Sequence, residues 1–347
     1  MIVATRVEKL RAEIEREGFE AVALPWRRRS HNLADELRAL AAITALYRRV
    51  KPDIVHHVAV KPVVYGGIAA RLARVRAQVN AIAGMGYVET SRQMRARTLR
   101  GVFNGVLRFA WSAPGVHVIV QNPDDREALS RTHLLPSSHI HMIRGSGVDV
   151  ARFTPSPEPP SPPVRVVYGG RLLLSKGIGE LVEAARMLKA RRVPVEVVLA
   201  GDPDVENPES ISASRVQTWV AEGIVSHIPW TDDMASIWRD AHIAALPSYR
   251  EGLPKALLEA AASGRAIVAA DVPGCREIAR NGVNALLVPA RDASALALAI
   301  EKLALDPALR ARFAAAGREI VVSEYAESIV VRETLALYHD LCTTEPR

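Results

Sequence analysis

The sequence predicts an α/β protein built from two doubly wound domains, each with a parallel sheet. Short apolar runs alternate with amphipathic helical patterns along the whole chain, as they do where helices join parallel strands. Six prolines within residues 154–163 interrupt this alternation near the middle and favour a stiff linker. With 347 residues, 49% of them hydrophobic, the chain is long enough for two cores.

The elements follow from the pattern in order. In the first half we expect strands at 1–5, 21–24, 53–57, 79–82, 116–121 and 139–143, and helices at 7–17, 32–49, 62–73, 91–111 and 123–131. In the second half we expect strands near 164–168, 195–200, 224–228, 242–246, 266–270 and 285–288, with helices between them and at 293–305, 307–323 and 327–341. The predicted domains are therefore residues 1–154 and 164–324, separated by a linker at 155–163 and followed by a terminal segment at 325–347.

The net charge of +7 is distributed unevenly. Residues 1–150 hold 23 Lys and Arg against 13 Asp and Glu, whereas the remainder holds 22 against 25. The basic half should meet an anionic partner, either nucleic acid or an anionic membrane surface. Aromatic residues make up only 5% of the chain, and we find no nucleic-acid-binding motif, so no nucleic-acid partner is predicted.

Two further features of composition bear on the compartment. Cys275 and Cys342 show neither metal-binding nor redox spacing, and the chain has no apolar run of about 18 residues. We therefore expect a protein of the reducing cytoplasm, without a metal site.

The stretch 246–259 combines a strand end with two carboxylates. An apolar run at 243–246 is followed by Pro247, Ser248 and Gly252, and a helical pattern begins after Pro254. Glu251 then lies in a loop at the carboxyl edge of the sheet, and Glu259 lies about two turns into the helix. Carboxylates accept hydrogen bonds from hydroxyl groups, and the free N–H groups at the start of a helix bind anions. A ligand with hydroxyls and phosphates, such as a nucleotide sugar, fits this arrangement.

Two similar strand-to-helix loops flank this stretch in the sequence. Residues 166–178 contain Arg171 and Lys176, cations suited to a diphosphate, and residues 271–277 follow another apolar strand. The backbone N–H groups of Gly252 and Leu253 are further candidates for contacting sugar or phosphate. The alternative for each is an ordinary loop residue or helix cap facing solvent.

The order and spacing of these three loops, with R-x4-K at 171–176 and E-x7-E at 251–259, resemble retaining glycosyltransferases of family 4. The resemblance covers residues 164–305 closely and implies a GT-B fold whose last helix returns to the first domain. It implies that Arg171 and Lys176 contact the donor diphosphate without a metal, that Glu251 contacts the donor sugar, and that Glu259 accepts from the ribose diol. The implied donor is a UDP-sugar.

Weaker similarities at 53–57, 61–67 and 199–204 point to members that build surface polysaccharides. They imply a polyprenyl-diphosphate-linked acceptor and a peripheral position on the inner face of the cytoplasmic membrane. Two other interpretations stay open: a GT-B sugar-nucleotide epimerase, and a nucleotide-sugar-binding protein without turnover.

The first half departs from the family pattern in two ways. Many members carry a histidine at the position of Val58, so His57, or the neighbouring His56, is the candidate catalytic substitute, the alternative being a structural histidine. The family also begins with a central strand and helix before the element at 2–5. We therefore expect the first sheet to lack the strand that would pair with both 2–5 and 53–57. Lys61, residues 84–88 and residues 146–149 are further candidates at the same edge.

Residues 91–111 form a basic amphipathic pattern. The stretch holds five arginines and no acidic residue, and its apolar residues share one helical face. The arginines are Arg92, Arg95, Arg97, Arg100 and Arg108. Phe109 and Trp111 lie at its end. Such helices bind anionic membranes, and the alternative is a core helix with a solvated basic face.

Overall fold

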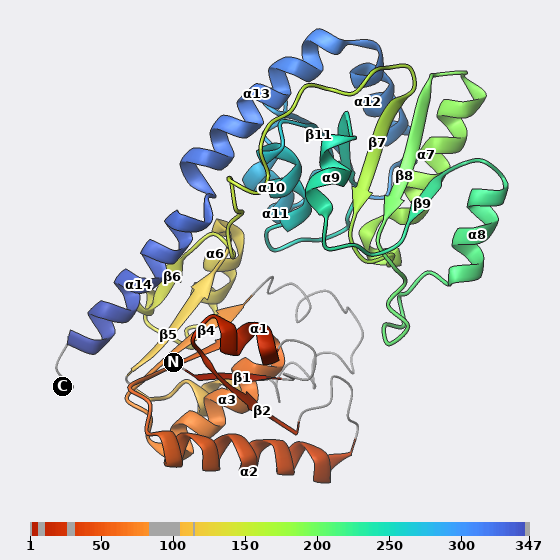
Figure 1. Cartoon of the computed structure of the whole chain (residues 1–347). Helices are drawn as coiled ribbons and strands as arrows, with labels where there is room; N and C mark the ends of the chain where they lie inside the picture. Colours follow the sequence, from red (N-terminus) through yellow and green to blue (C-terminus); the bar gives the residue numbers. More distant parts are fainter. Residues whose placement is uncertain (1, 6–10, 26–31, 83–104, 114, 344–347) are drawn as a thin grey trace. The chain divides into compact units, whose positions relative to one another are not determined.

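The computed structural model describes residues 2–5, 11–25, 32–82, 105–113 and 115–343. The chain divides into two compact units, one of Met1–Met142 with Leu335–Arg347 and the other of Ile143–Thr334. The division lies between Met142 and Ile143, ahead of the predicted linker. Figure 1 labels the elements of both units. Within the residues just given, no helix is long and apolar enough to cross a membrane.

The first unit contains a parallel four-stranded sheet in the order β3-β4-β5-β6. Its strands are β3 (Ile54–Val58), β4 (Ala77–Ile82), β5 (Val116–Val120) and β6 (Ile140–Met142). Two further strands, β1 (Ile2–Thr5) and β2 (Glu20–Ala23), pair in parallel with each other. Over the part of the chain that is described, no ladder joins this pair to β3.

The helices of the first unit begin and end at local signals. They are α1 (Arg11–Arg16), α2 (Leu33–Val50), α3 (Val60–Ala73), α6 (Pro123–Arg131) and the short 3₁₀ helix η1 (Ser137–His139). The Asn32 side chain caps α2 by accepting from the Ala34 N–H, and Lys51 ends α2 in the left-handed conformation.

Only the end of the predicted helix at 91–111 lies within the described residues. Residues 105–110 are helical. Leu107, Ala110 and Trp111 are buried in the core of the first unit, whereas Arg108 and Phe109 are exposed. Trp111, at the end of this predicted membrane-binding helix, therefore belongs to the core, as the alternative of a core helix expects for that residue.

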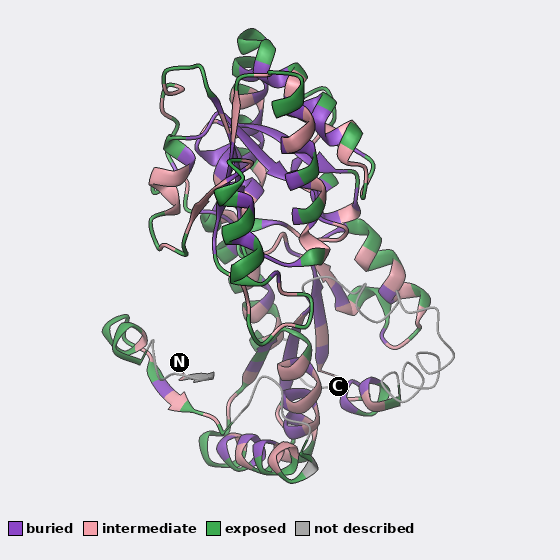
Figure 2. Cartoon of the chain, turned by 90° about the vertical axis from the view of Figure 1, so that its right-hand side faces the viewer, coloured by how far each residue is buried: buried purple, intermediate pink, exposed green. Residues whose placement is uncertain are grey.

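The second unit is a six-stranded parallel sheet in the order β12-β11-β10-β7-β8-β9. Its strands are β7 (Val164–Gly169), β8 (Val195–Ala200), β9 (Ser226–Ile228), β10 (Ile243–Leu246), β11 (Ala266–Ala270) and β12 (Ala285–Val288). Every residue of β10 and β11 is buried, because helices cover both faces of the sheet. Figure 2 shows buried residues gathered in the interior of this unit, with exposed ones on the surrounding helices. Strand order reverses between β7 and β10, so the carboxyl ends of these two strands form the topological switch point.

The helices of the second unit follow the predicted alternation. They are η2 (Leu174–Lys176), α7 (Ile178–Ala190), α8 (Ala213–Ala221), α9 (Met234–Arg239), α10 (Lys255–Ala262), α11 (Pro273–Ile278), α12 (Ala293–Leu305), α13 (Pro307–Glu324) and α14 (Glu327–Thr343). The last helix contributes residues to both units, and in the first unit Tyr338 hydrogen-bonds to His56.

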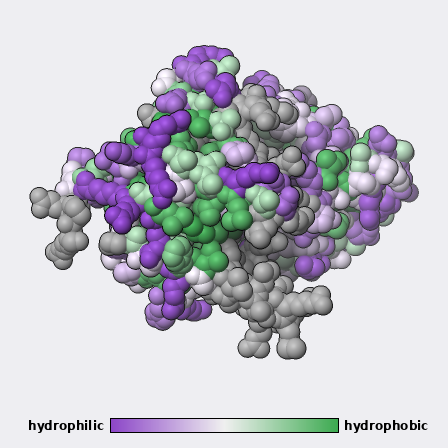
Figure 3. Space-filling model, turned by 90° about the horizontal axis from the view of Figure 1, so that it is seen from below, coloured by the Kyte–Doolittle hydropathy of each residue, from purple (hydrophilic) through white to green (hydrophobic). Residues whose placement is uncertain are grey.

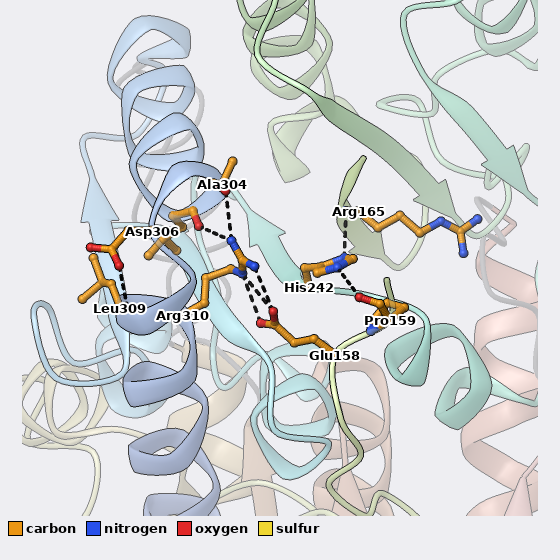
Figure 4. Close-up of polar contacts among 9 residues, drawn as sticks. Glu158, Pro159, Arg165, His242, Ala304, Asp306, Leu309 and Arg310 are labelled. Atoms are coloured by element: carbon orange, nitrogen blue, oxygen red, sulfur yellow. Dashed lines mark hydrogen bonds and ion pairs between the residues drawn. The ribbon is translucent and has the colours of Figure 1, made fainter. Parts of the chain in front are cut away.

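The proline-rich segment is bound to the second unit rather than free (Figure 4). The Glu158 carboxylate accepts from Nε of buried Arg310 at 3.1 and 3.2 Å and from its Nη2 at 2.9 Å. The same guanidinium also donates to the Leu303 and Ala304 carbonyl oxygens near the end of α12. The Pro159 carbonyl accepts from His242 Nε2 at 3.1 Å, and His242 Nδ1 accepts from the Arg165 N–H. The prediction of an independent linker at 155–163 therefore needs correction, because these polar contacts make it part of the second unit.

Candidate active site

Two loops at the switch point are locked together through their backbones. The loop after β7 ends at Gly177, whose φ of 72° lies in the left-handed region. A Cβ at this position would lie 2.1 Å from the Pro247 carbonyl oxygen in the loop after β10. The Tyr249 N–H donates to the Ser175 carbonyl at 2.9 Å, and Ser248 Oγ donates to the same oxygen. The two loops therefore hold a fixed relative position.

This locking brings Lys176 and Glu251 into contact. Lys176 Nζ lies 2.6 Å from Glu251 Oε1, and the two side chains are 24% and 11% exposed. The third predicted loop packs beneath them, since a Cβ on Gly274 would lie 2.4 Å from the carbonyl oxygens of Glu251 and Gly252. All three loops found in the sequence thus meet at one edge of the sheet.

Arg171 projects from the first residues after β7. Its carbonyl oxygen accepts from Tyr168 Oη at 2.7 Å, which fixes the turn. Its guanidinium is 52% exposed and lies 2.8 Å from Asp204 Oδ2, in the loop after the neighbouring strand β8. The sequence analysis missed this partner, because nothing local relates residues 171 and 204. An exposed cation on the switch-point edge can contact an anionic ligand.

Glu259 lies in the second turn of α10, as predicted. Its Oε2 accepts from the indole N–H of Trp238 at 3.3 Å. Burial raises the pKa of the Glu259 carboxyl, while the hydrogen bond from Trp238 and the charges of Lys255 and Arg152 oppose that increase. Trp238 is a second residue that the sequence analysis did not find.

Gly252 and Leu253 lie between the Glu251 carboxylate and the start of α10. Leu253 packs its side chain against the hydrophobic core and against Gly145, where an added Cβ would lie 3.0 Å from Leu253 Cδ2. Any ligand contact by Leu253 therefore belongs to its backbone, as the sequence analysis assumed. The candidate turn at 146–149 is structural, because Asp149 Oδ1 accepts from the N–H groups of Ala151 and Arg152.

His57 does not have the surroundings of a catalytic group. It is 4% exposed, its Nδ1 donates to Asn80 Oδ1 at 2.9 Å, and its Nε2 lies 2.9 Å from the Tyr47 hydroxyl. Burial lowers the pKa of His57 to about 4, so the ring is neutral. A Cβ on Gly66 would lie 2.4 Å from this ring. The catalytic prediction for His57 is corrected accordingly, because both ring nitrogens are engaged in hydrogen bonds within the protein and the ring packs against Gly66.

The other first-unit candidates are also accounted for. Lys61 Nζ lies 2.7 Å from Glu36 Oε1, and its ammonium is near the Tyr65 ring. Val58, at the position where many family members carry histidine, is exposed. Residues 84–88 lie outside the described residues. Within the described ranges, no group of three or more His, Cys, Asp and Glu side chains is arranged to hold a metal ion.

A doubly wound sheet with cations and carboxylates at its switch point is typical of proteins that bind nucleotides. Comparison with protein-family models identifies the class of protein more closely. Residues 151–320 match the family model of group 1 glycosyl transferases, and residues 1–122 match that of glycosyl transferase 4-like proteins. The chain belongs to this family, and the protein is a glycosyltransferase.

Two curated relatives span most of the chain. One is the N,N'-diacetylbacillosaminyl-diphospho-undecaprenol alpha-1,3-N-acetylgalactosaminyltransferase of Campylobacter jejuni, 26% identical, with 92% of this chain and 86% of the relative covered. The other is the UDP-Gal:alpha-D-GlcNAc-diphosphoundecaprenol alpha-1,3-galactosyltransferase of Escherichia coli, 23% identical, with coverages of 84% and 77%. Both are transferases, so they support that interpretation rather than the epimerase or binding-protein alternative.

Solved structures of similar proteins show the fold. Sucrose-phosphate synthase from Thermosynechococcus elongatus superposes with a TM-score of 0.79 at 22% identity, covering 95% of this chain and 85% of that chain. HepE from Anabaena, solved in complex with UDP, gives 0.75 at 18% identity, with coverages of 96% and 91%. The fold is GT-B, as predicted.

Proposed function

We propose that this glycosyltransferase moves a sugar from a UDP-sugar to a polyprenyl-diphosphate-linked saccharide, with retention of anomeric configuration and without a metal. The observation that carries the proposal is the contact of Lys176 with Glu251 at the switch-point edge that also holds Arg171. Two relatives whose names specify diphosphoundecaprenol-linked substrates, one of them also a UDP-sugar, support this choice of donor and acceptor.

The proposed mechanism assigns one task to each side chain. When the bond from anomeric carbon to diphosphate breaks, negative charge collects on the leaving oxygens, and the Lys176 ammonium and Arg171 guanidinium stabilise it. These two cations supply the charge that a metal supplies elsewhere. Glu251 accepts from the sugar hydroxyls and orients the sugar, while Glu259 accepts from the ribose diol. Backbone N–H groups of Gly252 and Leu253 contact sugar or phosphate.

An activity assay with matched variants tests these assignments. Arg171→Ala, Lys176→Ala and Glu251→Gln should each lower transfer from a UDP-sugar to an undecaprenyl-diphosphate-linked acceptor by about 10²- to 10³-fold, the usual effect of removing an electrostatic contact to a transition state. Arg186→Ala removes a partly exposed cation of α7 that pairs with Glu222 beyond the end of α8, and it should leave the rate unchanged. Thermal melting checks that each variant is folded.

Further readouts separate the alternatives. Unchanged turnover after replacing Arg171 and Lys176 together would contradict the diphosphate assignment. UDP-sugar binding without transfer would favour the binding protein, and inversion at C2 of free UDP-sugar would favour the epimerase. Activity that persists in excess EDTA is expected, and product NMR should show the anomeric configuration of the donor.

Membrane association is the second part of the proposal: the protein acts on the inner face of the cytoplasmic membrane. The basic charge of the first half and the arginines of residues 91–111 support it. The first unit also exposes large apolar side chains, among them Leu72 and Phe109, and the Arg71 guanidinium lies 4.6 Å from the Phe109 ring. Figure 3 shows apolar side chains gathered beside hydrophilic ones on the face seen from below.

A further inference from the structure

Trp238 is a buried tryptophan whose one polar atom reaches the candidate site. The side chain is 1% exposed, and its Nε1 lies 3.3 Å from Glu259 Oε2. Its position is fixed from two sides. A Cβ on Gly169, the last residue of β7, would lie 3.0 Å from Trp238 Cζ2, and the Trp238 carbonyl accepts from Arg265 Nε at 2.8 Å. The indole therefore has little freedom to turn away from Glu259.

Glu259 needs a fixed donor of this kind. A half-buried carboxylate has lost part of its hydration. A hydrogen bond from an N–H group to its ionised oxygen replaces some of that hydration and fixes the plane of the carboxylate. Lys255, one turn earlier on α10, and Arg152 contribute charge, and the indole contributes direction. A carboxylate has about four lone-pair sites, so it can accept one hydrogen bond from Trp238 and still accept two from the hydroxyl groups of a diol.

We propose that Trp238 is a positioning residue that holds the Glu259 carboxylate for the ribose diol of the nucleotide donor. This inference rests on the proposed function, which assigns Glu259 to that diol. If the indole sets the carboxylate plane, its loss should weaken recognition of the 2′-hydroxyl more than binding of the nucleotide as a whole. A residue that merely fills the core would not distinguish a ribose from a deoxyribose.

Calorimetric titration of the full chain with UDP and with 2′-deoxy-UDP tests the proposal. Trp238→Phe keeps an aromatic ring and removes the N–H. It should weaken UDP binding by about 5- to 10-fold, the effect of losing about one ordinary hydrogen bond, and 2′-deoxy-UDP binding by much less. Trp219→Phe, at another buried tryptophan of the same unit, should leave both affinities unchanged. An unchanged preference for UDP over 2′-deoxy-UDP in folded Trp238→Phe would overturn the inference.

Glu259→Gln separates this inference from the proposed function. If Glu259→Gln keeps the full preference for UDP, the assignment of Glu259 to the diol fails, and the role of Trp238 fails with it. If Glu259→Gln loses the preference and Trp238→Phe keeps it, only the positioning role fails.

A measurement on the unaltered tryptophan covers the case in which Trp238→Phe does not fold. The chain has five tryptophans, so ¹⁵N spectra contain five indole signals. One of them should move as UDP is added and as Glu259 titrates with pH. In Glu259→Gln that signal should no longer respond to pH. If none of the five indole signals moved with either UDP or pH, the contact between Trp238 and Glu259 would be contradicted.

Discussion

At the residue scale, the functional assignment of a side chain depends on what the fold places around it. Lys176 and Glu251 lie where their motifs predict, on loops at the switch point, and contact each other at 2.6 Å. His57 is the last residue but one of β3, near the carboxyl edge of its sheet. It faces inward, however, where Asn80 and Tyr47 occupy its two nitrogens. A position near the carboxyl edge of a sheet therefore does not by itself make a side chain available to a ligand.

His57→Ala should lower stability rather than catalysis. It leaves the Tyr47 hydroxyl and the Asn80 amide oxygen buried without their partner, which costs about 1 to 3 kcal/mol. Urea unfolding at pH 7.5 measures this loss, and exposed His339→Ala on α14 is the control. A variant of normal stability whose transfer rate falls 100-fold would restore the catalytic assignment.

The same histidine predicts a pH dependence. Its folded-state pKa of about 4 lies below the ordinary value of 6.5. Between these values the unfolded chain binds a proton that the native state does not, so this contribution to stability is complete above pH 6.5 and is lost as pH falls toward 4. His57→Ala should therefore show a flatter decrease in unfolding free energy over that window than the unmodified chain. An equal decrease in both would contradict the assignment.

At the element scale, the site is a product of two strand-to-helix loops that fit only because one residue has no side chain. Gly177 adopts a left-handed φ and lies against the Pro247 carbonyl, so the loops after β7 and β10 approach through backbone atoms. The contact sets where Lys176 and Glu251 lie relative to each other. Strand order alone would bring the loops only to neighbouring positions on the sheet edge.

Gly177→Ala should damage catalysis through this loop contact. A Cβ at 2.1 Å from the Pro247 oxygen forces the loops apart, and a shift of about 1 Å in a reacting group costs about 10²-fold in rate. Gly179→Ala is a matched control two residues away, in α7, where an added Cβ meets no atom within 4 Å. It should leave the rate unchanged and stabilise the protein slightly, by about 0.4 to 1 kcal/mol. Equal rates for the two variants would refute the role of the loop contact.

At the scale of the whole molecule, charge is segregated along the chain. The first 150 residues carry a balance of +10, and the remainder carries −3. This asymmetry favours an orientation in which the first unit meets an anionic surface while the second unit, which holds the candidate site, binds the nucleotide. Such attraction acts over about a Debye length and weakens as salt increases.

Vesicle flotation tests this orientation. The protein should float with phosphatidylglycerol vesicles but not with phosphatidylcholine vesicles, and the bound fraction should fall as salt rises. Replacing Arg95, Arg97 and Arg100 with Gln should weaken binding, at about 1 kcal/mol for each arginine near the surface. Replacing Arg186, Arg191 and Arg215 of the second unit removes the same charge and should have little effect. Equal binding of both variants, or of both vesicle types, would contradict the proposal.

The sequence by itself determined the two main parallel sheets, nearly all their strands, the three strand-to-helix loops, and the placement of Arg171, Lys176 and Glu251 on these loops and of Glu259 in the helix that follows. These features depend on local periodicity, on glycine and proline positions, and on spacing within about 14 residues, all of which are present in the chain order. The tertiary structure decided the partners: Asp204 for Arg171, Trp238 for Glu259, Asn80 and Tyr47 for His57, and Arg310 for Glu158. Each pair joins residues on different elements, and only the packing of those elements brings them within hydrogen-bonding distance.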